Sequence, residues 1–382
     1  MKYLLYALTL FLLPMGMSTA QWIEDSAIDA LIAQGIVDTY NLKFEAADAA
    51  FTRVVNNYPE HPAGHFFLAM VEWWRILIEI ENDSRDRRFY KMLDDVIALC
   101  DKRLKQQESD IAGLFFKGGA IGFKGRLLAT RKSWVRAATT GRQALPVVMD
   151  AAELAPDNAD LAFGTGIYDY YAAVLPDRYP VLKPLMVFLP KGNRERGLKD
   201  LKRAAEHGHF ANWEAQYFLM QTLYGIENKP SSALHYAREL HAKFPDNPVF
   251  QRYLGRIFVK LGAWESAGEV FADILDRSAS NKRGYTTIMQ REASYYLGYQ
   301  AMLNKDYGKA MKHLVECDRL SRGLDSEPSG FMVMANLRMG MVHDLLKQRE
   351  YATKQYDKVL RMPDYRGSRD LARRYKRAAY SI

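Results

Sequence analysis

Small and large apolar residues recur along this chain at one fixed spacing. Gly35 is followed twelve positions later by Ala47, and Phe51 comes four positions after that. Two helices that cross closely need small residues at the crossing and a large residue beside it to fill the space. The same order returns three more times, in Gly255 with Ala267 and Phe271, Gly298 with Ala310 and Leu314, and Gly340 with Ala352 and Tyr356. The spacing therefore predicts a repeated helix–turn–helix hairpin.

Prolines and polar turns divide the chain into these hairpins. The first comprises residues 24–41 and 43–57 and ends at Pro59. Pro62 begins a helix that is apolar on nearly every side, which predicts that it is fully buried. Later units are expected over residues 111–155 and from starts near Pro248, Arg291 and Val333, with longer loops in 277–290 and 321–331 and a basic closing helix over 369–380.

One unit is irregular. A helix expected over residues 160–175 is followed by four prolines between 176 and 190, and prolines so placed exclude one continuous helix. An ordinary hairpin needs only a few connecting residues, so 176–190 is an insertion. Its apolar side chains either fold back over the array, or Leu185–Leu189 forms an exposed hook that enters a partner or a membrane surface.

These features resemble tetratricopeptide repeats, which have small residues at the helix crossing and a proline near the end of each unit. Leu254-Gly255 and Leu297-Gly298 carry the Leu-Gly pair typical of that family, and Pro156 and Pro245 end further copies. The resemblance implies an all-α, right-handed superhelical solenoid of about eight hairpins that holds protein or peptide partners. It carries over no catalytic residue. The expected organisation is N-terminal hairpins over 21–159, the irregular hairpin over 160–210, C-terminal repeats over 211–363 and a basic capping helix over 364–382.

The first twenty residues have the features of a signal peptide. Lys2 precedes an apolar run from Leu4 to Met17, and Ser18-Thr19-Ala20 supplies the small residues of a cleavage site. We expect cleavage near Ala20, and a periplasmic or outer-membrane-associated protein. The alternative, an uncleaved membrane anchor, is disfavoured because the run is shorter than the ~20 residues of a span and contains Pro14.

The charge of the chain is unevenly distributed. The formal net charge is +8, and no acidic residue occurs between Asp110 and Asp150. Within that stretch Lys117, Lys124 and Arg131 are spaced seven residues apart and therefore share one helix face. This face is either a solvated edge or a docking surface for an anionic partner or membrane head groups. For an exported protein, acidic lipids, glycans or proteins are better candidate partners than nucleic acid.

Motifs for catalysis or for cofactor binding do not occur in the sequence. It has no His-Glu-x-x-His zinc pattern, no Gly-x-Ser-x-Gly elbow and no phosphate loop. We therefore predict a non-enzymatic protein that needs no metal and no cofactor. Cys100 and Cys317 are predicted to be two separate buried thiols, because in a solenoid each unit touches only its neighbours.

The partner is expected in the concave groove formed by the first helices of the repeats. Counting positions from the repeat register gives Phe218, Arg252, Arg256, Tyr295, Tyr299, Leu337 and Met341 as inward-facing residues. This mixture resembles a peptide groove, but it departs from the Lys/Asn carboxylate clamp of chaperone-binding relatives. The leading hypothesis is a non-catalytic scaffold in the cell envelope, in which Arg252, Arg256, Tyr295 and Tyr299 supply contacts.

A second hypothesis is a site for a small molecule, a glycan or a lipid, serving transport or the cell wall. Tyr168, Tyr170 and Tyr171 lie just before the insertion and would line an aromatic pocket with it. Stacked aromatic faces suit sugar rings. A closed pocket at this place would favour this hypothesis over an open groove.

Overall fold

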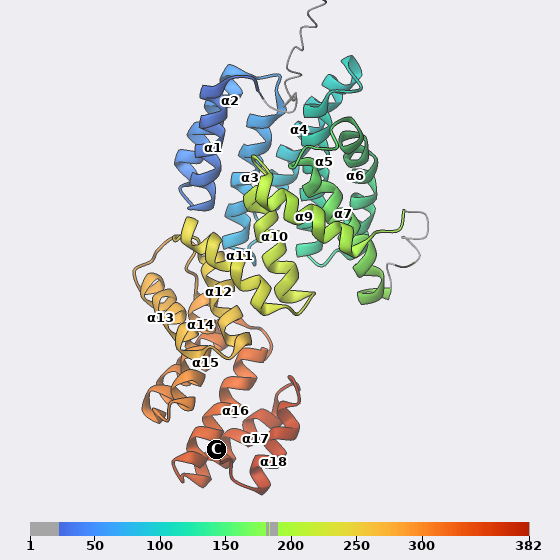
Figure 1. Cartoon of the computed structure of the whole chain (residues 1–382). Helices are drawn as coiled ribbons and strands as arrows, with labels where there is room; N and C mark the ends of the chain where they lie inside the picture. Colours follow the sequence, from blue (N-terminus) through green and yellow to red (C-terminus); the bar gives the residue numbers. More distant parts are fainter. Residues whose placement is uncertain (1–22, 181–182, 184–189, 382) are drawn as a thin grey trace, which may run out of the picture.

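The computed structural model describes residues 23–180, 183 and 190–381. Within these residues the chain forms 17 helices and no strand (Figure 1). They pair into eight antiparallel hairpins and a closing helix, so the fold is the predicted all-α helical repeat solenoid. The helices are α1 (Ser26–Tyr40), α2 (Phe44–Asn57), α3 (Pro62–Ile78), α4 (Asp86–Gln106), α5 (Ile111–Thr130), α6 (Trp134–Leu154), α7 (Leu161–Arg178), α9 (Arg194–His207), α10 (Asn212–Gly225), α11 (Pro230–Lys243), α12 (Pro248–Leu261), α13 (Trp264–Ala279), α14 (Thr287–Leu303), α15 (Tyr307–Leu324), α16 (Gly330–Leu345), α17 (Arg349–Arg361) and α18 (Ser368–Arg377).

The repeated glycine is the point where the two helices of a hairpin cross. A Cβ atom placed on Gly35 would lie 2.7 Å from the ring of Phe51, sixteen positions later. The other three copies are the same, with 2.8 Å from Gly255 to Phe271, 2.8 Å from Gly298 to Leu314 and 2.5 Å from Gly340 to Tyr356. Any side chain at these positions would push the helices apart. The predicted role of the glycine is confirmed in all four copies.

The turns inside the hairpins share one geometry. Lys132 and Lys305 take left-handed backbone angles, with φ of 61° and 60°, two positions after α5 and α14 end. The next amide in each turn donates to a carbonyl five residues earlier, from Ser133 to Leu128 and from Asp306 to Ala301. This bond satisfies a carbonyl of the last helical turn and reverses the chain. Leu42 and Lys347 occupy the same place after α1 and α16, and Gly262, one position after the end of α12, has the same left-handed conformation.

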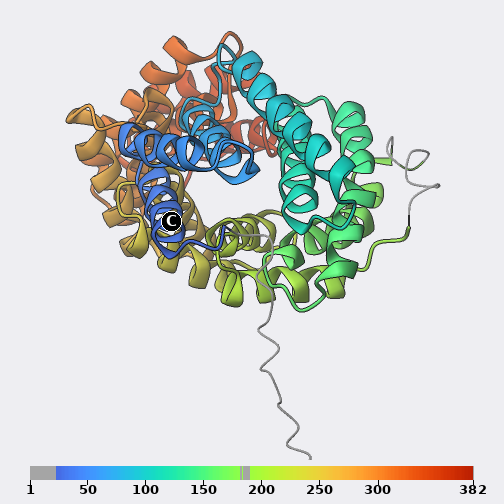
Figure 2. The ribbon, with the colours of Figure 1, turned by 90° about the horizontal axis from the view of Figure 1, so that it is seen from above.

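The solenoid closes on itself after one superhelical turn. Figure 2 shows α1–α12 winding around a common axis until the first hairpin lies beside α11 and α12. The ring of Tyr40, at the end of α1, stacks on Phe244 and Phe250 with centroids 5.0 and 6.0 Å away. The side-chain amide of Asn247 donates to the carbonyl oxygen of Tyr40 over 2.7 Å. The expectation that each unit touches only its neighbours is therefore wrong for the first hairpin.

A polar centre lies inside this closed turn. The guanidinium of Arg126, from α5, contacts the carboxylate of Glu214, from α10, and lies over the rings of Trp73 and Tyr217 at 5.1 and 5.4 Å. Burial opposes the charged form of Arg126, but Glu214 outweighs this and raises its pKa. The hydroxyl of Tyr40 donates to the other oxygen of Glu214 over 2.7 Å. Three helices far apart in sequence are thus joined at one point.

The apolar core is continuous across the segments expected from the sequence. One continuous cluster of buried side chains runs from Ile28 in α1 to Ala293 in α14. Smaller clusters centred on Leu314 and Tyr356 hold the last repeats together. The segments 21–159 and 160–210 therefore share one core with the start of the C-terminal repeats.

Several local predictions can be compared with the structure. Cys100 and Cys317 are free and buried, as predicted. The longer loops are shorter than predicted, residues 280–286 and 325–329, because the helices on both sides extend into them. Helix α7 continues through Pro176 to Arg178, beyond the predicted end.

Other predictions fall on residues that the structure does not describe. The signal peptide at 1–20 lies outside the described residues, and so does most of the insertion (181–182 and 184–189). No described helix combines the length and the apolar character needed to span a membrane.

Candidate partner-binding cleft

A cleft of 370 Å³ opens next to the line of closure. Its walls come from the end of α3 and the residues after it, from α10 and α12, and from the loop that leads into α14. Apolar side chains cover much of the surface, among them Leu77, Ile80, Val249 and Ile288. Arg252, Tyr253 and Arg256 supply polar groups on one side, and Glu79, Glu81 and Asn82 supply them after the end of α3. This combination of an apolar lining with a few convergent polar groups is typical of a binding site.

The loop wall of the cleft depends on Gly284. This residue has a φ of +83°, a conformation that glycine adopts without strain. A Cβ here would lie 2.8 Å from Pro248 of α12 and 3.2 Å from Leu42 of the first hairpin. Next to it Arg283 donates to both oxygens of Glu45 over 2.9 Å and lowers the pKa of that carboxyl to about 2. The closure thereby fixes one wall of the cleft.

Arg252 and Arg256 are adjacent on α12 and share one buried carboxylate. Glu292 of α14, whose side chain is 1 % exposed, accepts from Nε of Arg252 over 2.6 Å and from Nη2 of Arg256 over 2.7 Å. Burial opposes the charged form of Glu292, but the two arginines outweigh this and lower its pKa. Two cations against one anion give this group a net positive charge.

Each arginine keeps part of its guanidinium for other contacts. Nη1 of Arg252 and Nη1 of Arg256 have no acceptor among the described residues. About a quarter of each side chain is exposed, 26 % and 25 %, and both residues line the cleft. Because a guanidinium binds planar acceptors through paired N–H groups, the cleft offers two pre-positioned donors for a carboxylate or carbonyl group.

Glu292 is the residue that the sequence analysis missed. It lies three positions before Tyr295, on the same face of α14, which the repeat register places inward. A carboxylate on a buried face needs a cationic partner. The two arginines of the preceding repeat, forty and thirty-six positions earlier, were the available ones.

The other predicted groove residues are not part of the cleft. The ring of Tyr299 lies 3.8 Å from the guanidinium of Arg338, which also donates to the hydroxyl of Tyr295. Met341 packs against the core of the last repeats. Phe218 (5 % exposed), Tyr295 and Leu337 are buried between helices, so their predicted exposure in a groove is wrong. A partner-binding role for Tyr299 and Met341 stays a prediction.

The predicted basic face is matched by acidic residues of the preceding helix. Lys117 pairs with Asp101, Lys124 with Asp94 and Arg131 with Asp86, at 2.6, 2.6 and 2.7 Å. The two helices are antiparallel, so cations spaced by seven on α5 meet anions spaced by seven and eight on α4. The positive charge of this face is therefore balanced locally, because α4 supplies the acids that residues 111–149 lack. Whether these three residues dock an anionic surface stays a prediction.

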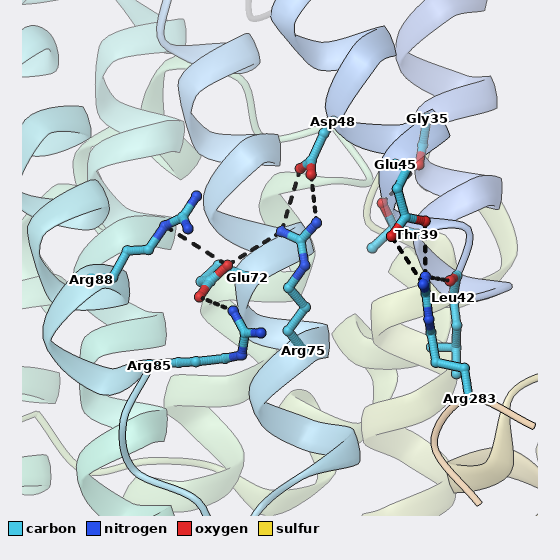
Figure 3. A network of polar contacts seen from close by, with 10 residues as sticks. All are labelled: Gly35, Thr39, Leu42, Glu45, Asp48, Glu72, Arg75, Arg85, Arg88 and Arg283. Carbon is cyan, nitrogen blue, oxygen red and sulfur yellow. Dashed lines mark hydrogen bonds and ion pairs between the residues drawn. The ribbon is translucent and has the colours of Figure 1, made fainter. Parts of the chain in front are cut away.

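A second ion-pair network holds α2, α3 and α4 together (Figure 3). The carboxylate of Glu72 has no exposed surface and contacts Arg75, Arg85 and Arg88 at 3.2, 3.1 and 4.0 Å. Arg75 also donates to Asp48 over 2.5 Å. Buried charges need such partners. The network stabilises the first hairpins.

The tyrosines before the insertion already have partners. Tyr170 is buried and donates to Glu227 over 2.7 Å, and Tyr168 donates to the carbonyl oxygen of Pro190 over 2.6 Å. Most residues of the insertion lie outside the described part of the chain, so the predicted pocket there stays a prediction. Among the described residues no group of three His, Cys, Asp or Glu side chains is placed to hold a metal ion.

Comparison with known proteins gives one family match. Residues 221–282 match the model of a family described as tetratricopeptide repeat. They run from α10 to the loop after α13 and include the copy of the crossing formed by Gly255, Ala267 and Phe271. No curated protein matches the chain.

Solved structures of the human IFIT1 dimer, one with PPP-AAAA and one with m7Gppp-AAAA, are similar to the chain at 15% identity and a TM-score of 0.41. The similarity covers 84% of this chain and 69% and 68% of theirs, and it is too distant to support a functional argument. The family match and the four equivalent helix crossings agree: the chain contains tetratricopeptide repeats, which the family model matches over residues 221–282.

Proposed function

We propose that this protein is a non-catalytic scaffold of the cell envelope that binds an extended segment of a partner protein in the cleft at Arg252 and Arg256. Tetratricopeptide repeats generally mediate protein–protein interaction. The observation that carries the proposal is the pair of guanidinium groups. Each is anchored on Glu292, each has an Nη1 without an acceptor among the described residues, and both residues line the cleft. Export rests on the signal-peptide features of residues 1–20.

The chemistry of the cleft defines the segment that would fit. Two arginine donors suit a side-chain carboxylate or a run of backbone carbonyls. Val249, Ile80 and Ile288 suit an apolar side chain beside it. Because Glu292 and the closure already hold the walls in place, the scaffold loses little conformational entropy on binding. An acidic residue flanked by aliphatic residues is therefore the expected core of the recognised segment.

The test is an array of octapeptides that carry one Asp or Glu between aliphatic residues, paired with the same peptides carrying Asn or Gln. We expect the folded chain to bind the acidic members and to bind their amide partners at least about tenfold more weakly, because a charge-assisted hydrogen bond is worth about twice a neutral one. Equal binding of both sets would contradict the role assigned to the arginines.

The variant for this test is Val249→Glu. It places a carboxylate in the cleft without leaving Glu292 unpaired, so binding of acidic peptides should be lost by like-charge repulsion. Val315→Glu is the matched control, since Val315 is 51% exposed on α15 and far from the cleft in sequence. Loss of binding in both variants, or in neither, would contradict the assignment of the site.

A further inference from the structure

Helix α6 carries an apolar surface that the described part of the fold covers only in part. Its buried side, formed by Ala144, Leu145 and Ala151, packs on the neighbouring helices. Eleven large hydrophobic residues of the described chain are exposed, and four of them lie on α6, whereas no other helix carries more than two. The four are Trp134, Val135, Met149 and Leu154. Exposed apolar residues gathered on one element indicate an interaction surface.

Cations are interleaved with these side chains. Val135, Arg142 and Met149 are spaced seven residues apart and therefore lie almost in line along one side of the helix. Val135 is 50% exposed and Met149 41%. Lys132 and Arg136 flank the N-terminal end of the same helix, where Trp134 stacks on Tyr179 with centroids 4.9 Å apart. We call Lys132, Trp134, Val135, Arg136, Arg142 and Met149 the α6 face.

The cations of the α6 face differ from their neighbours in one respect. Lys132, Arg136 and Arg142 are exposed and have no ion-pair partner among the described residues, whereas Lys117, Lys124 and Arg131 each pair with α4. The unpaired cations of this region therefore lie just before α6 and along its N-terminal part. Asp150 and Glu153 lie toward the other end of the helix, so its N-terminal part carries the positive potential.

We propose that the α6 face docks on the surface of a lipid bilayer that contains acidic lipids. Lys and Arg side chains attract anionic head groups, while Trp, Val and Met side chains enter the boundary between head groups and acyl chains. Trp is favoured at that depth because its ring is amphipathic. The helix lies at the outer edge of the molecule (Figure 1), and a bilayer accepts the outer face of one helix without a matching concave surface. The proposal does not depend on the cleft at Arg252.

The test measures co-sedimentation of residues 21–382 with vesicles of phosphatidylcholine and phosphatidylglycerol, and with vesicles of phosphatidylcholine alone. This chain contains every described helix and lacks the apolar N-terminal run, which would itself bind membranes. We expect binding to the acidic vesicles and at least about tenfold weaker binding to the neutral ones, with loss of binding as salt is added. Equal binding to both, or to neither, would overturn the proposal.

Two variants locate the surface. The triple variant Lys132→Glu, Arg136→Glu and Arg142→Glu should lose binding to acidic vesicles, and Val135→Ser with Met149→Ser should weaken it severalfold at unchanged charge. The matched control is Lys305→Glu, Lys309→Glu and Lys312→Glu, which changes the net charge equally on α15. Lys305 occupies the same turn position there as Lys132 does before α6. Equal loss in the control, or no loss in the α6 variants that remain folded by circular dichroism, would overturn the proposal.

Binding of a soluble polyanion distinguishes docking on a bilayer from docking on an acidic protein. If polyaspartate binds the α6 face as tightly as acidic vesicles do, the surface recognises charge alone and the proposal fails. If Trp134 enters the bilayer, brominated lipid quenches the fluorescence of the chain more than that of a Trp134→Phe variant. Equal quenching of the two chains would contradict insertion of this residue and overturn the docking geometry.

Discussion

The hydroxyl of Tyr40 donates to the carboxylate of Glu214 across 174 positions of sequence, over 2.7 Å. This hydrogen bond joins the first hairpin to α10 inside the closed turn. Burial and the carboxylate both raise the pKa of Tyr40, so it stays a donor at every physiological pH. The bond is therefore a permanent part of the closure.

Tyr40→Phe should loosen this closure while its ring contacts remain. We expect a loss of about 1.5–2 kcal/mol in the free energy of unfolding, the lower part of the range for bonds to charged groups, because Glu214 keeps Arg126. Tyr58→Phe is the control. It removes a comparable bond to Asp25 in a more exposed place and should cost under about 1 kcal/mol. Urea unfolding gives both values, and an equal effect of the two variants would contradict a special role for Tyr40.

The repeated crossing gives a second prediction. Gly298→Ala should destabilise the chain by about 1–2 kcal/mol net, since the new Cβ would lie 2.8 Å from Leu314 Cγ and 3.2 Å from the Leu314 backbone nitrogen. Gly122→Ala should instead stabilise it by about 0.5–1 kcal/mol, because this helical glycine has no atom within 4 Å of the new Cβ. The midpoint temperatures of thermal unfolding of the two variants should therefore shift in opposite directions. A rise in both midpoint temperatures would show that helix propensity, and not packing at the crossing, determines the effect of the substitution.

The repeat could be predicted from sequence because its signal is local. Gly298 and Leu314 are sixteen positions apart, and the phase of such pairs does not depend on the rest of the fold. The closure depends on pairs such as Asn247 and Tyr40, 207 positions apart, which no periodicity marks.

The candidate site also combines features that local sequence predicts with contacts that it does not. Arg252 and Arg256 could be placed on an inward face by counting positions, but their shared partner Glu292 comes from the next repeat. The charge of the α5 face could not be predicted because α4 supplies the acids that neutralise it.

A pH prediction concerns His61, the residue that precedes α3. Its Nδ1 accepts from the amide of Ala63 over 3.3 Å, which requires the neutral ring. Burial and then Arg103 lower the pKa of His61 to about 4, from 6.5. The unfolded chain takes up this proton first, so the stabilisation is complete above pH 6.5 and is lost as the pH falls toward 4. Between pH 7 and pH 5 we expect His61 to contribute a loss of about 2 kcal/mol.

His61→Asn isolates this contribution. Asparagine caps a helix without titrating in this range. The variant should therefore lose about 2 kcal/mol less than the natural chain between pH 7 and pH 5 in urea unfolding. Parallel pH profiles would contradict the assignment, because the two chains differ in this residue alone.

The two cysteines should be inert in the folded chain. Burial raises the pKa of both the Cys100 and the Cys317 thiol to about 12, so almost no reactive thiolate forms near neutral pH. A thiol reagent such as dithionitrobenzoate should label neither residue in buffer and both in urea without a reductant. No labelling in urea would show a disulfide, and labelling in buffer would show that one of these helices opens.

The last prediction tests whether Glu292 holds the cleft together. Glu292→Ala should cost about 3–5 kcal/mol, because it leaves Arg252 and Arg256 side by side without their shared anion. Changing all three residues to Met should cost less than this single change, since no unpaired charge then remains, although the peptide-binding donors are lost. Urea unfolding measures the stability of both variants, and peptide binding measures the loss of the donors. If the single variant is as stable as the natural chain, the arginines are held by other contacts and the cleft is not pre-positioned by this carboxylate.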